Sequence, residues 1–403
     1  AAFAGAAGLL GKFGLGRRLS YLLAASYLAS PFIILHVSYA ALAYGMALLP
    51  AYAFATLTCF SGYLDQAQPR YRRILYVLGF FATAVFALFL DGYTFVMFFV
   101  LGMLFVVLAC DKNRLSGHPL MPRCLQAGGL YLVAFTLAYF LMKAYFPSLD
   151  TLRLMGADVF RSMGLDLYFV IHPASSLHWL AGWLGGTVEY DSAIHYGDAS
   201  LALGSYLGVT ALVALLGLFH SSLAPARRGL FAGFLVLVFL LSLGPSLKYD
   251  SRRLDAGNLQ KPVEQYFMPK EAAILSFGLD RVYESVPGLK NMRATYRWHA
   301  LTLFFLWFLF ALLTHRLQED ERRGLMFILL FAYVLDRAPD PVFVVERAKN
   351  FYAYAETMTR NAVDEMARYL KRDEFVYFWP SGNDFFAHYA APLLGVRAYN
   401  VGG

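Results

Sequence analysis

The chain has 403 residues, of which 59% are hydrophobic and 15% are charged, and its mean hydropathy is +0.51. This balance excludes an ordinary water-soluble globular protein and indicates an integral membrane protein. The net charge of +7 does not indicate nucleic acid, because excess Lys and Arg in membrane proteins marks cytoplasmic loops and contacts with anionic lipid, so we expect no nucleic-acid partner.

Apolar stretches long enough to cross a bilayer, about 20 residues each, recur along most of the chain. We predict nine membrane spans, preceded by a partial one at 1–10. The sequence therefore predicts an α-helical polytopic bundle over residues 1–336, with outer loops at 146–199 and 247–297. The expected spans lie near 19–37, 39–60, 75–90, 93–110, 125–145, 200–220, 229–246, 298–315 and 324–336.

The distribution of positive charge predicts the orientation of this bundle. Fourteen Lys and Arg residues fall in five short loops that all lie on one side of the predicted spans, whereas the opposite short turns, around 36–38 and at 91–92, carry none. Because Lys and Arg resist translocation, we expect the basic side to be cytoplasmic and the long loops to be extracytoplasmic. The three cysteines, Cys59, Cys110 and Cys124, end apolar segments beside basic loops, and we expect reduced thiols there.

Two segments of the outer loops, 152–163 and 272–282, have helical periodicity. We predict that both are amphipathic helices lying on the outer membrane face, with ordinary helices of a soluble loop domain as the alternative. The repeating apolar positions are Leu152, Met155, Val159 and Met163 in the first segment and Ala272, Leu275, Leu279 and Val282 in the second.

The segment from Asn291 onward, "NMRATYRWHALTLFF", begins a predicted span at its outer end. Arg293 and Arg297 are four residues apart and share one face if the helix extends back to Met292. Two guanidiniums above a helix N-terminus suit a phosphate, and Lys290 adds a third cation. We therefore predict a binding site for the phosphate of a lipid, with Trp298 behind the arginines. The alternative is that both arginines snorkel to head groups while Trp298 joins the aromatic belt.

Four other candidates lie at predicted outer ends of spans. Lys248 and Tyr249 follow the Gly-Pro helix stop of "LSLGPSLKYD"; they line an anion or sugar site, or else form a helix stop and an interface anchor. Asp91, between two spans, is a candidate catalytic carboxylate, and its alternative is a turn aspartate beside Gly92. His36 is either a ligand for the substrate or an interface residue.

The first large outer loop contains histidines and aspartates that are compatible with a divalent metal. Their spacing matches no zinc pattern, so we name no metal ligand and expect no certain cofactor. The sequence also contains no serine-hydrolase elbow, P-loop, dinucleotide fingerprint or HExxH motif. The residues compatible with a metal are His172, His178, Asp191, His195 and Asp198.

The sequence pattern changes near the C-terminal end. "AVDEMARYLKRD" predicts a helix, "EFVYFWP" a strand, "GNDFFAHYAAPLL" a second helix and "VRAYNV" a second strand. This order predicts an extracytoplasmic α/β domain at 337–403, which we expect to be incomplete.

The runs "LSYLLAASYLASPFIILH…ALLPAYAF", "LSLGPSLKY" and "VPGLKNMRATYRW" resemble polytopic bacterial glycosyltransferases of the GT-C superfamily, including their YfhO-like and uncharacterised relatives. The resemblance covers most of residues 1–315. It implies a multi-pass protein of the bacterial inner (cytoplasmic) membrane, with a soluble domain outside. It also implies transfer of a sugar from a polyprenyl-phosphate carrier to a lipid, glycan or protein on the outer face, as in the synthesis of cell-envelope polysaccharide.

The resemblance further implies that "MRATYRW" lies near the carrier phosphate and that the catalytic acid follows the first span. We expect that region to precede Ala1, so Asp91 only stands in for the acid. In the implied inverting reaction a carboxylate deprotonates or orients the acceptor hydroxyl, while cations stabilise the leaving phosphate.

Two other functions stay open. One is an enzyme like O-antigen ligases or polysaccharide polymerases, and the other is a non-catalytic membrane subunit with protein partners in a larger complex. A lipid-glycan transporter is disfavoured, because the predicted spans contain almost no ionisable residues.

Overall fold

The computed structural model is mostly helical and describes residues 1–112, 120–145, 155–174, 177–220, 223–253, 266–379 and 384–398. The chain divides into two compact units, Ala1–Asp340 and Pro341–Gly403. The sequence placed the boundary at 336/337, and that domain division stays a prediction.

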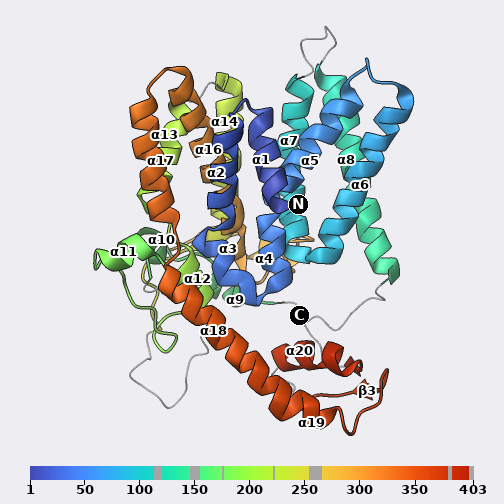
Figure 1. Cartoon of the computed structure of the whole chain (residues 1–403), viewed down its shortest axis with the longest axis vertical. Coiled ribbons are helices and arrows are strands. Elements are labelled where there is room, and N and C mark those ends of the chain that lie inside the picture. The colour runs from blue at the N-terminus through green and yellow to red at the C-terminus, as the bar shows by residue number, and fades with distance from the viewer. Residues whose placement is uncertain are drawn as a thin grey trace. The chain divides into compact units, whose positions relative to one another are not determined.

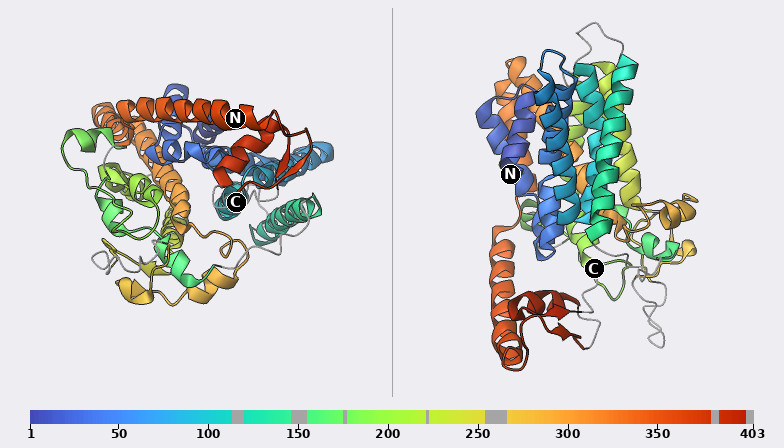
Figure 2. Two further views of the ribbon diagram at one scale, coloured as in Figure 1. Left: turned by 90° about the horizontal axis from the view of Figure 1, so that it is seen from below. Right: turned by 90° about the vertical axis from the view of Figure 1, so that its right-hand side faces the viewer.

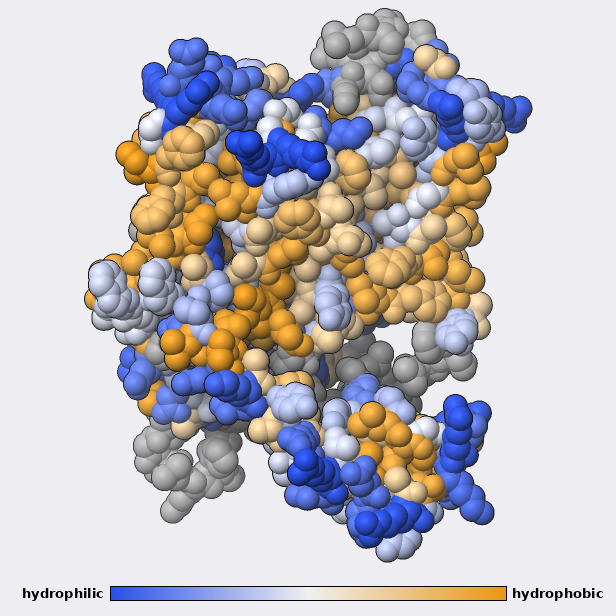
Figure 3. Space-filling view, in the orientation of Figure 1, coloured by the Kyte–Doolittle hydropathy of each residue, from blue (hydrophilic) through white to orange (hydrophobic). Residues whose placement is uncertain are grey.

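The first unit is a bundle of helices that run side by side along its long dimension (Figure 1). Hydrophobic residues form a broad band across this unit, between more hydrophilic ends (Figure 3). The helices of the bundle are α1 (Ala2–Lys12), α2 (Arg17–Leu28), α3 (Pro31–Leu35), α4 (Ala40–Ala47), α5 (Leu49–Leu64), α6 (Arg70–Leu90), α7 (Gly92–Lys112), α8 (Leu120–Tyr145), α13 (Gly208–His220), α14 (Pro225–Leu243), α16 (His299–Glu319) and α17 (Arg323–Arg337).

Within the described ranges, six helices are long and apolar enough to span a membrane, or seven if the bent pair α4–α5 forms one span. A helical membrane protein is therefore confirmed at this level, while the count of nine spans stays a prediction. Two predicted spans do not form one long continuous helix in the structure. The stretch 200–220 is broken between Gly204 and Gly208, and α17 has only 15 residues.

Helix α16 forms the centre of the bundle. In the most apolar stretch of α16, 83% of the residues are buried inside the protein. The corresponding share is only 22% to 28% in α6, α8 and α14. The indole Nε1 of Trp307 donates a hydrogen bond of 2.9 Å to the carbonyl of Leu23 in α2. The rings of Phe304 and Phe308 stack on each other, and Phe304 packs edge-on against Tyr27 of α2 and Phe105 of α7. Because every face of α16 is covered by protein, its two ends are held firmly in the bundle.

The long connections form a layer at the end of the bundle opposite the α16–α17 turn (Figure 2). We call it the outer layer, after the predicted outer loops that it contains. Helix α14 ends at Leu243 because Gly244 takes a φ of +75°, which confirms the helix stop that the sequence predicted. The layer contains α9 (Ala157–Ser162), α10 (Leu167–Ile171), α11 (Trp179–Trp183), α12 (Ala199–Gly204), α15 (Asp280–Ser285), the antiparallel strands β1 (Ser246–Leu247) and β2 (Leu275–Ser276), and the short 3₁₀ helices η1 (His36–Ser38), η3 (Lys270–Ala272) and η4 (Thr295–Trp298).

The two amphipathic helices predicted for this layer have different outcomes. In the first segment Leu152 lies outside the described residues, and Val159 and Met163 are buried within the protein. The second segment is not one helix, because Ser276 pairs with Ser246 in β2 and Gly278 takes a φ of +69° before α15. Its contact with the membrane stays a prediction.

The second unit consists of helices and one pair of strands. It contains α18 (Pro341–Met358), a π-helical turn (Thr359–Val363), α19 (Asp364–Met366), β3 (Phe375–Val376), α20 (Asp384–Leu394) and β4 (Arg397–Ala398). Strands β3 and β4 pair in parallel, with Phe375 opposite Arg397. Such a pairing needs a crossover connection, and α20 supplies it.

Candidate functional site

Arg297 lies at the start of the central helix among three tyrosine rings. Its guanidinium carbon is 4.6 Å from the ring centroid of Tyr93, 5.5 Å from that of Tyr39 and 5.9 Å from that of Tyr296. Tyr39 directly precedes α4, Tyr93 belongs to the first turn of α7, and Tyr296 belongs to η4. Cation–π attraction from several rings holds the guanidinium in place without neutralising its charge.

The backbone around Arg297 corrects the predicted geometry of the arginine pair. The helix does not extend back to Met292, because Ala294 takes a non-helical ψ of 75° and the first turn is 3₁₀. The Met163 carbonyl fixes this turn by accepting hydrogen bonds from the Tyr296 N–H (2.9 Å) and the Thr295 hydroxyl (3.1 Å). Arg293 therefore precedes the helix and is exposed, so the two arginines do not form a fork on one helical face.

Arg293 nevertheless acts on the same surroundings as Arg297. Burial raises the pKa of the Tyr39 phenol, the Asp198 charge raises it further, and the charges of Arg297 and Arg293 lower it. Both guanidiniums and one carboxylate thus act on a single tyrosine. The site combines one partly buried and one exposed arginine.

Asp198 is the site residue whose role the sequence analysis missed. It caps α12, its Oδ1 accepting a hydrogen bond of 3.1 Å from the Leu201 N–H. Its Oδ2 accepts a hydrogen bond of 3.4 Å from the Tyr296 hydroxyl. Burial raises the pKa of the Asp198 carboxyl, while backbone N–H donors, the Arg297 charge and the Tyr296 hydrogen bond lower it. A signal for this residue existed, since an aspartate directly before an apolar run is a typical N-cap.

Tyr296 connects the carboxylate to the guanidinium. Its hydroxyl donates to Asp198, and its ring centroid lies 5.9 Å from the guanidinium carbon of Arg297. Among the ion pairs of the described residues none joins Asp198 to Arg297 directly. The Nε of Arg297 is buried without a hydrogen-bond partner in the described part of the chain. The site therefore contains a hydrogen-bond donor for an anion, the Arg297 guanidinium, and a nearby carboxylate, that of Asp198, which do not form an ion pair with each other.

His36 supports this site from behind. It is buried, its Nδ1 lies 2.7 Å from the Phe32 carbonyl oxygen, and its ring stacks on Tyr296 with the centroids 6.0 Å apart. His36, which the sequence predicted as a ligand for the substrate, instead packs behind Tyr296 and helps to orient its phenol ring.

Lys248 does not line an anion site. It is fully buried, and its Nζ donates hydrogen bonds to the carbonyls of Ser162 (3.2 Å) and Gly164 (2.6 Å). Burial lowers the pKa of the Lys248 ammonium to about 8, against the raising effect of Asp166. Lys248 therefore stabilises the fold of the outer layer, while the neighbouring Tyr249 is exposed and packs edge-on against Tyr168.

Three further residues that the sequence predicted for the site are Asp91, Trp298 and Lys290. Asp91 caps α7, its Oδ2 accepting a hydrogen bond of 2.7 Å from the Thr94 N–H, which fits the turn aspartate. Trp298 is fully buried in the core, so it does not join an aromatic belt at the lipid surface. Lys290 is partly buried and lies two residues after Gly288, which takes a φ of +89°.

The histidines and aspartates considered for a metal are dispersed. His195 lies 3.4 Å from Asp250, and His178 packs edge-on against Tyr206. No group of three His, Cys, Asp or Glu side chains that could hold a metal ion occurs among the residues described. Asp198 is the one of these residues that lies beside Arg297.

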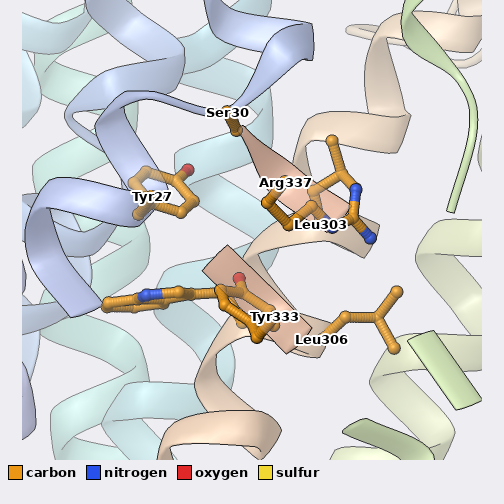
Figure 4. A pocket seen from close by; sticks show the side chains of 7 residues that line it. Tyr27, Ser30, Leu303, Leu306, Tyr333 and Arg337 are labelled. Atoms are coloured by element: carbon orange, nitrogen blue, oxygen red, sulfur yellow. The ribbon is translucent and has the colours of Figure 1, made fainter. Parts of the chain in front are cut away.

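A separate small cavity lies between α2, α16 and α17 (Figure 4). Its volume of about 20 Å³ suffices for about one water molecule and excludes a sugar or phosphate. Arg337 borders the cavity and donates hydrogen bonds to the carbonyls of Tyr206 and Leu207. The lining residues are Tyr27, Ser30, Leu303, Leu306, Trp307, Tyr333 and Arg337.

No protein-family model, curated protein or solved structure matches this chain.

Proposed function

We propose that the chain is a GT-C-type membrane glycosyltransferase that moves a sugar from a polyprenyl-phosphate carrier to a lipid, glycan or protein acceptor on the extracytoplasmic face. The observation that carries the proposal is the Asp198–Tyr296–Arg297 arrangement at the outer end of the central helix. It supplies the two chemical groups that the reaction needs, a cation for the leaving phosphate and a carboxylate for the acceptor.

Arg297 is the proposed phosphate ligand. Its guanidinium is preorganised by three tyrosine rings, and its Nε–H has no hydrogen-bond partner among the described residues. Planar guanidinium groups bind phosphate oxygens strongly, above all where water is partly excluded. As the carrier's C–O bond breaks, negative charge grows on the lipid phosphate, and Arg297 stabilises that charge in the transition state.

Asp198 is the proposed general base, in place of Asp91. The acceptor hydroxyl attacks the sugar carbon, its proton passes to the Asp198 carboxylate, and the carrier leaves as the lipid phosphate. A carboxyl whose pKa burial has raised is a stronger base than an exposed one. The Arg297 charge and the Tyr296 hydrogen bond oppose that rise in the pKa and so favour the ionised form that the reaction requires.

The test is a mass-spectrometric assay of the purified protein in lipid nanodiscs with polyprenyl-phosphate sugars and membrane lipid extract. We expect Arg297→Gln to lower kcat by about 100-fold or more, as for removal of one donor to a developing anion. We expect a loss of similar size for Asp198→Asn, which removes general-base catalysis but retains the helix cap. Arg293→Gln should have a smaller effect, because Arg293 is exposed.

The matched control is Arg252→Gln, since Arg252 is an exposed arginine of the same outer layer and pairs with Asp250. It should retain wild-type turnover. A wild-type protein that consumes no carrier, or an Arg297→Gln variant that matches wild type while folded, would overturn the proposal and favour a non-catalytic subunit.

A further inference from the structure

Between Asp166 and Glu189 the chain has 22 consecutive residues without Asp, Glu, Lys or Arg. Such a stretch is long enough for a membrane span. The structure instead places two helices of five residues in it, α10 (Leu167–Ile171) and α11 (Trp179–Trp183), and α10 ends where His172 takes an extended conformation. The stretch is therefore uncharged although it belongs to the outer layer.

Helix α11 leaves large apolar side chains uncovered. Trp183 is 77% exposed, Leu184 directly after the helix is 68% exposed, and Trp179 is also exposed. Trp179 and Trp183 are four residues apart and so lie on one face of α11. No residue of α11 is buried within the protein. This face has a composition that soluble loops avoid.

Helix α11 lies next to the end of α17, a helix that exposes apolar side chains. The Asp340 N–H donates a hydrogen bond of 3.0 Å to the Leu177 carbonyl, and His178 pairs with Pro339, so α11 begins directly beyond the outer end of α17. Helix α17 exposes Phe327, Ile328 and Phe331 along its length, as expected for a lipid-facing helix. Figure 1 shows α11 projecting sideways beside that end of α17.

We infer that α11 is an interfacial anchor whose tryptophans insert into the head-group region of the outer lipid leaflet. Tryptophan prefers this depth, because its ring is apolar and its indole N–H finds polar partners there. Because residues 167–188 contain no Asp, Glu, Lys or Arg, the stretch can lie at the edge of the hydrocarbon without burying a charge. The same anchor holds the following segment, in which the Tyr190 hydroxyl bonds the Gly197 carbonyl beside Asp198, near the membrane surface.

Tryptophan fluorescence of the full chain in nanodiscs tests this inference without any assay of activity. Wild type and Trp183→Phe are compared in unlabelled phosphatidylcholine, in phosphatidylcholine brominated on its acyl chains close to the glycerol, and with iodide in the water. Subtracting the emission spectrum of the variant from that of wild type gives the fluorescence of Trp183. We expect this component to be quenched by the brominated lipid and protected from iodide. The fluorescence component obtained in the same way for Trp179, from the Trp179→Phe variant, should also be quenched by the brominated lipid, but to a smaller extent.

Two results would overturn the anchor. If iodide quenches the Trp183 component and brominated lipid does not, α11 lies in water. If neither quencher acts, protein covers α11, as in contact with a second copy of the chain. Because Trp183 is exposed, its exchange for Phe should leave the melting temperature unchanged, and a failed anchor leaves the glycosyltransferase proposal standing.

Discussion

The hydroxyl of Tyr296 is the smallest group on which the proposed site depends. It donates to Asp198, interacts with Arg297, and belongs to a ring that His36 holds by stacking. Its hydrogen bond is one of the effects that lower the pKa of Asp198 against burial. Removing the hydroxyl while keeping the ring separates this electrostatic effect from packing.

We expect Tyr296→Phe to shift the acidic limb of the kcat/KM profile to higher pH. Without the hydrogen bond the pKa of Asp198 rises further, so a higher pH is needed to ionise the base. Activity is then lost at low pH and regained at high pH. A pH–rate profile measures the shift, with Tyr93→Phe as control, since the Tyr93 ring contacts Arg297 and no hydrogen bond joins it to Asp198. An unshifted limb would contradict a role for Asp198 as base.

Residue type alone could find Arg297 but not its partner. The cation and the start of the span are local features, and they suffice to predict a site at that end of the helix, which stays a prediction. Tyr296 and Asp198 are 98 residues apart, so only the fold brings them together. Lys248 and Trp298 were chosen by charge and aromaticity, yet burial against carbonyls and in the core decides their roles.

At the scale of elements, the start of η4 depends on the segment that follows α9. The Leu165 N–H donates a hydrogen bond of 2.8 Å to the Ser242 carbonyl in α14, and the neighbouring Met163 carbonyl accepts from Tyr296 and Thr295. Gly164 lies between these contacts. A Cβ added there would stand 2.0 Å from the Leu243 carbonyl oxygen, which no side chain tolerates.

Gly164→Ala should therefore destabilise the protein by about 1–3 kcal/mol through overpacking and lower transferase activity by displacing the Met163 carbonyl. Gly156→Ala is the matched control, because a Cβ at Gly156 meets nothing within 4 Å. Thermal unfolding in nanodiscs and the turnover assay measure both effects. Equal stability of the two variants would show that the contact between Gly164 and α14 does not constrain the site.

The apolar pattern located the membrane-crossing elements well where helices are continuous, as in α6, α7, α14 and α16. It did not predict the break within 200–220. Gly208 takes a φ of +70°, and a Cβ there would meet the Asp336 carboxylate at 2.2 Å. A contact between residues so far apart in the chain leaves no signal in hydropathy.

At the scale of the whole molecule, the proposed function requires the Asp198 end of the bundle to face outward. The basic connections, such as the loop between α5 and α6 and the loop between α16 and α17, lie at the opposite end (Figure 1). Positive loops predict which end is cytoplasmic, whereas the fold shows only that the two ends differ.

Cysteine labelling in intact cells measures this orientation. We expect Ala193→Cys, an exposed position of the outer layer, to react with a membrane-impermeant maleimide. Ala67→Cys, exposed in the basic loop between α5 and α6, should react only after the cells are opened, as should the partly exposed native Cys59 and Cys124. Labelling of Ala67→Cys in intact cells would reverse the topology and refute the proposed face of catalysis.

The order helix, strand, helix, strand was predicted near the C-terminal end, and the described part of the second unit has that order with parallel strands. Local periodicity suffices for such short elements. The role of this unit stays a prediction.

The burial of α16 also determines how the protein responds to membranes of different thickness. Hydrophobic mismatch acts on helices that touch lipid, which tilt or kink when the bilayer thins or thickens. Here that adjustment falls on α6, α8 and α14, whereas α16 meets almost no acyl chain. The tyrosine-held arginine at the end of α16 should therefore keep its geometry while the surrounding helices adapt. If the proposed function holds, we expect bilayer thickness to change the delivery of the lipid substrate and to leave the positions of Arg297 and Asp198 unchanged.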